Sequence, residues 1–144
     1  MASKFIALPK SVSEKSFAAA IAEFRRIVGQ DSVLVTAEQL APYIKTMMPV
    51  PDADHTPSAA LLATTVEQIQ KIVGICNTYK VPIWMISTGR NFGYGSAAPA
   101  ERGQVVLDLK RMNRILEVDP DLCFALVEAG VTYKQLYDYI QEHK

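Results

Sequence analysis

The residues best suited to chemistry lie between positions 87 and 99, in the segment S-T-G-R-N-F-G-Y-G-S-A-A-P. Glycine is used where the backbone takes positive φ or approaches a ligand closely, and consecutive exposed N–H groups form an anion-binding concavity. Arg90 adds a positive charge, and Thr88, Asn91 and Ser96 add short polar side chains. The segment therefore predicts a cradle for a phosphate-bearing cofactor, built around three glycines: Gly89, Gly93 and Gly95.

An ordinary surface loop is the alternative interpretation, because glycines occur in loops of every kind. The spacing G-x-x-x-G-x-G differs from the dinucleotide-binding pattern G-x-G-x-x-G. No lysine follows the last glycine, as it would in a nucleoside-triphosphate loop. Glycine spacing alone leaves both interpretations open.

Apolar runs on either side of this loop are expected to position it. Residues 81–86 (V-P-I-W-M-I) and 104–109 (Q-V-V-L-D-L) predict two buried strands. Residues 59–63 predict another strand, followed by a helix over 66–79 that begins with a capping box at Thr65 and Gln68. Strand, helix and strand in this order predict a parallel pair joined by a crossover. The loop then leaves a carboxyl strand end, where open α/β sheets bind ligands.

The residues before this unit predict one helix, one short strand and a long connection. Ser13 suits a helix N-cap, an apolar stripe with helical spacing follows from Phe17 to Val28, and Gly29 suits the position after the helix end. Residues 33–35 predict a short strand. Residues 36–58 contain four prolines, which exclude a long regular element, although a short helical turn fits residues 38–44.

The last third of the chain changes pattern. Lys110 and Arg111 are interpreted as a solvated turn. Residues 114–119 and 123–128 predict two strands joined by a P-D-L turn, and Thr132 and Gln135 predict a capping box at the start of a last helix. We therefore expect an α+β fold of two small α/β-like lobes, the first over residues 1–110 and the second over 111–144.

Composition limits the classes of partner. Fifteen Lys and Arg balance fifteen Asp and Glu, so no net charge attracts nucleic acid or an anionic membrane surface. No apolar run reaches the ~20 residues of a membrane-spanning helix, and no Cys/His cluster has metal-ligand spacing. The two cysteines, Cys76 and Cys123, are expected to be packing residues rather than a disulfide. A soluble protein follows, with the cytoplasm and the periplasm both open as its compartment.

The loop sequence also resembles a known family. I-S-T-G-R-N-F-G-Y-G-S-A-A-P (86–99) is similar to the pyrophosphate loop in the FAD-binding domain of the 4-cresol methylhydroxylase and vanillyl-alcohol oxidase family, called the PCMH type. Four further segments resemble the same family in the same order: M-M-P-V (47–50), T-T-V-E-Q-I-Q (64–70), R-G-Q-V-V-L-D-L-K-R-M-N (102–113) and Y-D-Y-I-Q-E (137–142).

The resemblance implies an FAD-dependent oxidoreductase that removes a hydride from the benzylic carbon of para-substituted phenols such as 4-cresol. Water then adds to the resulting quinone methide. Tyr94 matches a family tyrosine that holds the phenolate oxygen and is the one catalytic residue implied here. The loop residues implied to bind FAD are Thr88, Gly89, Arg90, Asn91, Gly93, Tyr94, Gly95 and Ser96.

The resemblance also implies partners. Some members of the family pass electrons to a c-type cytochrome subunit, others use oxygen, and a homo-oligomer is expected. Asn91 stands where members of the wider superfamily carry a histidine that bonds covalently to FAD, so no such bond forms there. Where the family usually has proline, this chain has Ala129, which loosens the turn.

Members of the family are several times longer than this chain, which ends inside a predicted helix. The expectation is an N-terminal part of a flavoprotein that by itself binds FAD at most. The alternative is a non-catalytic truncated α/β module that self-associates, because missing strands would leave sheet edges and an apolar face uncovered.

Overall fold

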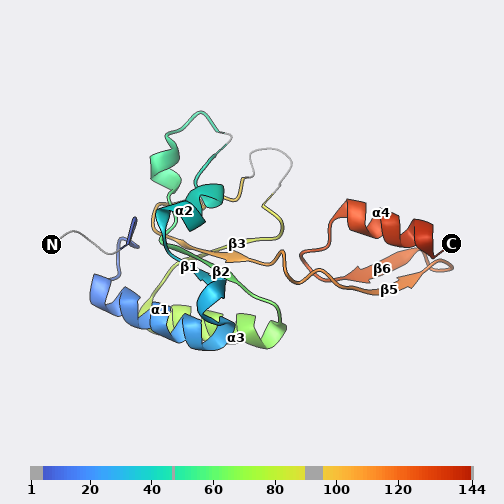
Figure 1. Ribbon diagram of the computed structural model, residues 1–144, viewed down its shortest axis with the longest axis horizontal. Helices are drawn as coiled ribbons and strands as arrows, with labels where there is room; N and C mark the ends of the chain where they lie inside the picture. The colour runs from blue at the N-terminus through green and yellow to red at the C-terminus, as the bar shows by residue number, and fades with distance from the viewer. Residues whose placement is uncertain (1–4, 47, 90–95, 144) are drawn as a thin grey trace.

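The computed structural model describes residues 5–46, 48–89 and 96–143. Its centre is a four-stranded sheet of β1 (Val33–Leu34), β2 (Ala59–Leu62), β3 (Ile83–Ile86) and β4 (Val105–Asp108), in the order β1-β2-β4-β3 (Figure 1). The strands β2, β4 and β3 are parallel, and β1 is antiparallel to β2.

The predicted strands are present, but two predictions about them are wrong. β3 is not the buried strand expected at 81–86, because it lies at the edge of the sheet and Met85 is 64% exposed. β2 and β3 are parallel, as expected, yet they do not pair with each other, because β4 lies between them and pairs with both. All four residues of β4 are buried, and a strand that is covered on both faces belongs in the interior of a sheet. The other interior strand, β2, is likewise buried at all four residues.

Two helices, α1 (Glu14–Val28) and α3 (Val66–Tyr79), cover one face of the sheet (Figure 1). The α1 stripe predicted from spacing is buried, with Phe17 and Phe24 fully so. Ser13 caps α1 by accepting from the Ser16 N–H, and Gly29 follows the helix with φ of 88°. Strand residues Leu61 and Leu107 meet these helices in the larger hydrophobic core.

The opposite face is covered by the proline-rich connection. It begins with α2 (Ala37–Leu40) and the 3₁₀ turn η2 (Ala41–Tyr43), which confirm the short helical turn expected there. A second, smaller core on this face joins Leu40 and Tyr43 to Ala60, Ile86 and Val106. Two further 3₁₀ turns, η1 (Gln30–Ser32) and η3 (Asp52–His55), lie in the connections before β1 and β2.

A hairpin–helix unit follows the sheet: β5 (Ile115–Asp119), β6 (Phe124–Val127) and α4 (Tyr133–Glu142). Its strands are antiparallel with a register shift between Ile115 and Glu117. In Figure 1 this unit extends away from the four-stranded sheet. The capping box at Thr132 and Gln135 is present as predicted. No helix in the described ranges has the length and apolar character needed to span a bilayer.

Candidate functional site

The glycine-rich loop begins at the carboxyl end of β3 and returns to the amino end of β4. Because β3 and β4 are parallel neighbours, this connection runs back along the length of the sheet. Thr88, Gly89 and Ser96 are described and lie on its two arms. The other predicted site residues, Arg90, Asn91, Gly93, Tyr94 and Gly95, lie outside the described residues.

The two arms of the loop meet at Gly89. This residue has φ of 72°, and a Cβ placed on it would lie 2.9 Å from the Cβ of Ala97 and 3.5 Å from Cδ1 of Ile86. Both the backbone conformation and the close approach require glycine. The loop is therefore closed at its base by backbone packing, which fixes the separation of its two arms.

The same strand end contacts the start of the hairpin–helix unit. The Ser87 hydroxyl, directly after β3, donates to the Ala129 carbonyl at 2.6 Å. The Gly130 N–H donates to the Met112 carbonyl at 2.7 Å, and a Cβ on Gly130 would lie 2.4 Å from the Leu109 carbonyl oxygen. Residues 129–130 are thus held against the exits of both β3 and β4.

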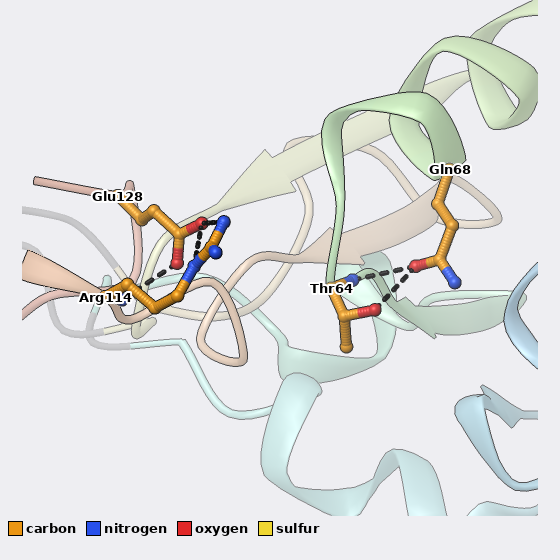
Figure 2. Close-up of polar contacts among 4 residues, drawn as sticks. All are labelled: Thr64, Gln68, Arg114 and Glu128. Carbon is orange, nitrogen blue, oxygen red and sulfur yellow. Dashed lines mark hydrogen bonds and ion pairs between the residues drawn. The ribbon is translucent and has the colours of Figure 1, made fainter. Parts of the chain in front are cut away.

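An ion pair secures this junction. The Arg114 guanidinium donates to Glu128 Oε1 from Nε at 2.9 Å and from Nη2 at 2.7 Å, and the Arg114 backbone N–H donates to Oε2 at 2.8 Å (Figure 2). These hydrogen bonds to Arg114 hold the pKa of Glu128 below its ordinary value. A charged Glu128 therefore fixes the first residue of the hairpin to the last.

The start of α3 differs from the predicted capping box. Thr65 accepts from the Gln68 N–H as expected, at 3.2 Å. The Gln68 side chain, however, accepts from the N–H and the hydroxyl of Thr64 at 2.8 and 3.0 Å (Figure 2). In a capping box the Gln68 side chain would accept from the N–H of Thr65. Here it accepts from Thr64, the residue before Thr65, because Thr64 offers two donors to the same amide oxygen. This bond fixes the turn from β2 into α3.

A buried polar cluster follows β4 and was not predicted. The Tyr43 hydroxyl donates to Asp108 Oδ2 at 2.6 Å, and the Lys110 ammonium lies 2.9 Å from the same oxygen. Burial and the bond to Asp108 raise the pKa of Tyr43. Burial disfavours the Lys110 ammonium, but its bonds to Asp108 and Tyr43 outweigh this and raise its pKa. Lys110 is therefore an ion-pair partner of Asp108, while its side chain stays 50% exposed in a turn, as the interpretation of a solvated turn expected.

Arg111 is also exposed in this turn, and its guanidinium donates to the Ser32 hydroxyl at 2.8 Å. The sequence signal for the cluster was Asp108 itself, a carboxylate in the apolar run V-V-L-D-L. A buried carboxylate requires partners. The sequence does not say that one partner is Tyr43, 65 residues earlier.

The described part of the loop lies next to the end of a parallel strand. Gly89 presents backbone without a side chain, and Thr88 and Ser96 add hydroxyl groups at the carboxyl edge of a parallel sheet, the edge where such sheets bind ligands. Among residues 5–46, 48–89 and 96–143, no group of three His, Cys, Asp or Glu side chains could hold a metal ion.

Comparison with known proteins agrees with this geometry. A family model described as an FAD binding domain matches residues 57–144. The 4-cresol dehydrogenase (hydroxylating) flavoprotein subunit of Pseudomonas putida is 62% identical over 136 residues, covering 94% of this chain and 26% of that protein. The chain thus spans about a quarter of that relative's length.

Two solved structures are similar. A crystal structure of p-cresol methylhydroxylase with substrate bound matches with a TM-score of 0.93 and 62% identity, covering 95% of this chain and 27% of the other. A 4-ethylphenol oxidase from Gulosibacter chungangensis, in complex with isoeugenol, matches with a TM-score of 0.90 and 38% identity, covering 94% and 26%. The expected α+β class and FAD as the cofactor are both confirmed. This chain belongs to the FAD binding domain family.

Proposed function

We propose that this chain contributes the cofactor loop of an FAD-dependent oxidoreductase that oxidises para-alkylphenols. The observation that carries the proposal is the 62% identity, over 94% of the chain, to a flavoprotein subunit named for 4-cresol oxidation. The position of Gly89 supports it, because this residue has φ of 72° and comes shortly after the carboxyl end of β3.

The FAD diphosphate is proposed to bind between the two arms of the loop. Thr88 and Gly89 on the outgoing arm and Ser96 on the returning arm hold it through backbone N–H and hydroxyl groups. Arg90, Asn91, Gly93, Tyr94 and Gly95 complete this set in the proposal. FAD, when bound, supplies the acceptor for the benzylic hydride of the phenol.

Tyr94 is proposed to donate a hydrogen bond to the phenol oxygen of the substrate. Hydrogen-bond donors around this oxygen favour the phenolate, and the phenolate makes the ring electron-rich enough to release a hydride from the para-alkyl carbon. Loss of the phenolic proton and that hydride gives a quinone methide. Addition of water to its exocyclic carbon then gives a 4-hydroxybenzyl alcohol.

We further propose that residues 1–110 form the lobe that carries the loop and that residues 111–144 begin a second lobe. A c-type cytochrome subunit is the proposed electron acceptor. The similarity to a protein named as a flavoprotein subunit supports this partner. A homo-oligomer of the flavoprotein is part of the same proposal.

The first test is a titration of the 144-residue chain with FAD, followed by flavin fluorescence. We expect saturable binding, and we expect Gly89→Val and Gly93→Val each to weaken it by about tenfold or more, because a Cβ blocks the approach of the backbone. Gly74→Ala is the matched control, because no atom lies within 4 Å of a Cβ at this position in α3. Equal FAD affinity in all four proteins would contradict the proposed cradle.

The non-catalytic alternative is favoured by one observation. The hairpin–helix unit exposes apolar side chains, including Leu116, Phe124 and Leu126 with 52%, 42% and 52% of their surface accessible. Exposed apolar groups of this size mark an interaction surface. Self-association is therefore the second candidate behaviour.

A further inference from the structure

The two arms of the glycine-rich loop are held by different parts of the chain. On the returning arm, His55 Nδ1 donates to the Pro99 carbonyl at 2.8 Å. At the end of this arm, the Arg102 guanidinium donates to the carbonyls of Ala53 and Ile6 at 2.7 and 3.0 Å. The returning arm is therefore bonded to the proline-rich connection and to the N-terminal segment.

The outgoing arm is held by the base of the hairpin instead. Ser87 is the first residue after β3, and its hydroxyl donates to the Ala129 carbonyl at 2.6 Å. Within residues 87–89, no other side chain forms a hydrogen bond with a described residue. The packing of Gly89 against Ala97 fixes the distance between the arms, but the Ser87 bond fixes where the outgoing arm lies relative to the hairpin.

The acceptor of this bond is itself held tightly. The Gly130 N–H donates to the Met112 carbonyl at 2.7 Å, and a Cβ on Gly130 would lie 2.4 Å from the Leu109 carbonyl oxygen. Backbone packed this closely leaves residues 129–130 no room to shift against the exit of β4. The Ala129 carbonyl is therefore a fixed point to which Ser87 ties the start of the loop.

Ser87 acts from outside the proposed contacts with FAD. Its single O–H is used by Ala129, whereas Thr88 and Gly89 are the described residues of this arm that are proposed to bind the cofactor. Both Ser87 and Ala129 are exposed, so loss of their bond leaves no buried polar group unpaired. Removing the hydroxyl should therefore move the arm without unfolding the chain.

We propose that Ser87 is a positioning residue for FAD binding. Its bond to Ala129 places Thr88 and Gly89 before the cofactor arrives, so the hairpin base preorganises a cradle whose other arm is held by the proline-rich connection. A preorganised site loses less conformational entropy when its ligand binds. This inference rests on the proposed function.

The first test removes and restores the hydroxyl. We expect Ser87→Ala to weaken FAD binding to the 144-residue chain about tenfold, measured by flavin fluorescence. Ser87→Thr keeps the hydroxyl and should restore most of the affinity. Thr78→Ala is the matched control, because the exposed Thr78 hydroxyl donates to the Gly74 carbonyl at 2.9 Å within α3. Equal FAD affinity in the Ser87→Ala, Thr78→Ala and unsubstituted chains would overturn the proposal.

Urea unfolding separates the position of the arm from the stability of the fold. Ser87→Ala and Thr78→Ala each remove one exposed bond between a hydroxyl and a carbonyl, so we expect similar small losses in the free energy of unfolding. A loss of FAD affinity in the first variant alone then reflects the position of the arm. If FAD affinity falls in proportion to stability in both variants, the role of Ser87 is structural and the proposal fails.

A second variant changes the other side of the bond. Gly130→Ala places a Cβ against the Leu109 carbonyl oxygen and is expected to displace the Ala129 acceptor, so it should weaken FAD binding as Ser87→Ala does. Because both changes break the same link, the double variant should bind FAD no more weakly than Gly130→Ala alone. Additive losses would show that the two residues act independently and would overturn the proposal.

The last measurement needs no FAD. In a ¹H–¹⁵N spectrum, whose dispersion shows that each variant folds, Gly130→Ala should shift the amide signals of Thr88 and Gly89 when Ser87 is present. In the Ser87→Ala background it should shift them much less. If the signals respond in this way but FAD does not bind, the proposed function fails and the placement of the arm by Ser87 stands. If FAD binds but the signals do not respond, the proposed function stands and this inference fails.

Discussion

Asp108 combines two properties that rarely occur together in one residue. Its side chain is 2% exposed, and it ends the central strand of the sheet. Isolated burial of a carboxylate is strongly unfavourable, so its hydrogen bonds decide whether the site is tolerated. The Tyr43 hydroxyl, the Lys110 N–H and the Lys110 ammonium all donate to it. The cluster therefore ties η2 to the exit of β4.

Removing one of these donors is expected to destabilise the fold. Tyr43→Phe leaves Asp108 Oδ2 with one donor fewer in a buried place, and hydrogen bonds to charged groups contribute about 1.5–3 kcal/mol. We expect a loss of this size in the free energy of unfolding, measured by urea titration. Tyr79→Phe is the matched control, because the Tyr79 hydroxyl donates to Glu23 at 2.5 Å in a partly buried setting. Equal losses in the two variants would contradict the importance of burial at Asp108.

At the scale of elements, the sequence predicted which segments form helices and strands but not how the strands are ordered. The spacing around Phe17 and the cap at Ser13 are local signals, and both are confirmed. The position of β4 between β2 and β3 depends on pairing between residues far apart, such as Leu61 with Leu107. Local patterns carry no information on such pairs, which is why the direct β2–β3 pairing was wrong.

At the candidate site, too, the local features were predicted and the long-range contacts were not. The segment 87–99 was predicted as a cofactor cradle from its residue types, and this stays a prediction, while Gly89 has the positive φ expected of such a loop. The bonds that hold the loop and its surroundings in place were not found, because the Ser87–Ala129 contact joins residues 42 positions apart. The partner of a hydroxyl becomes visible only when the chain is folded.

The base of the hairpin is expected to depend on pH. The pKa of Glu128 is lowered in the folded chain, so the charged form is stabilised by folding. This contribution is present above the ordinary glutamate value of about 4.3 and is lost as the pH falls through the lowered pKa. Thermal unfolding from pH 7 to pH 3 should therefore show a falling midpoint.

Glu128→Gln should flatten this fall, because glutamine does not titrate. Glu67→Gln is the comparison, since the pKa of Glu67 is also lowered but its causes are local to the start of α3. A Glu128→Gln chain with the same pH dependence as the unsubstituted chain would exclude Glu128 as the cause.

At the scale of the whole molecule, the two parts of the chain are buried to very different extents. Strand β4 is buried throughout, whereas all four residues of β6 are exposed. In an antiparallel hairpin, Phe124 and Leu126 share one side, and Val127 lines a pocket with Leu136 of α4. Alternation therefore places Phe124 and Leu126 on the side away from α4.

We expect the purified chain to self-associate through this side of the hairpin. Light scattering after size-exclusion chromatography should give a mass that rises with concentration, and Leu126→Lys should restore the monomer, because a buried lysine is unfavourable in an apolar contact. Val66→Lys is the control, since Val66 is 55% exposed on α3, outside the hairpin. A monomer at every concentration would contradict this expectation.

The connection from β3 to β4 has a consequence for engineering. In most parallel sheets a helix links neighbouring strands and a separate loop binds the ligand, so the loop can be exchanged while the scaffold stays. Residues 87–104 join two directly paired parallel strands, so under the proposed function a single segment performs both tasks. A graft that alters its length changes the tether of the central strand as well as the cradle. A transplant of the proposed cradle must therefore include β3 and β4.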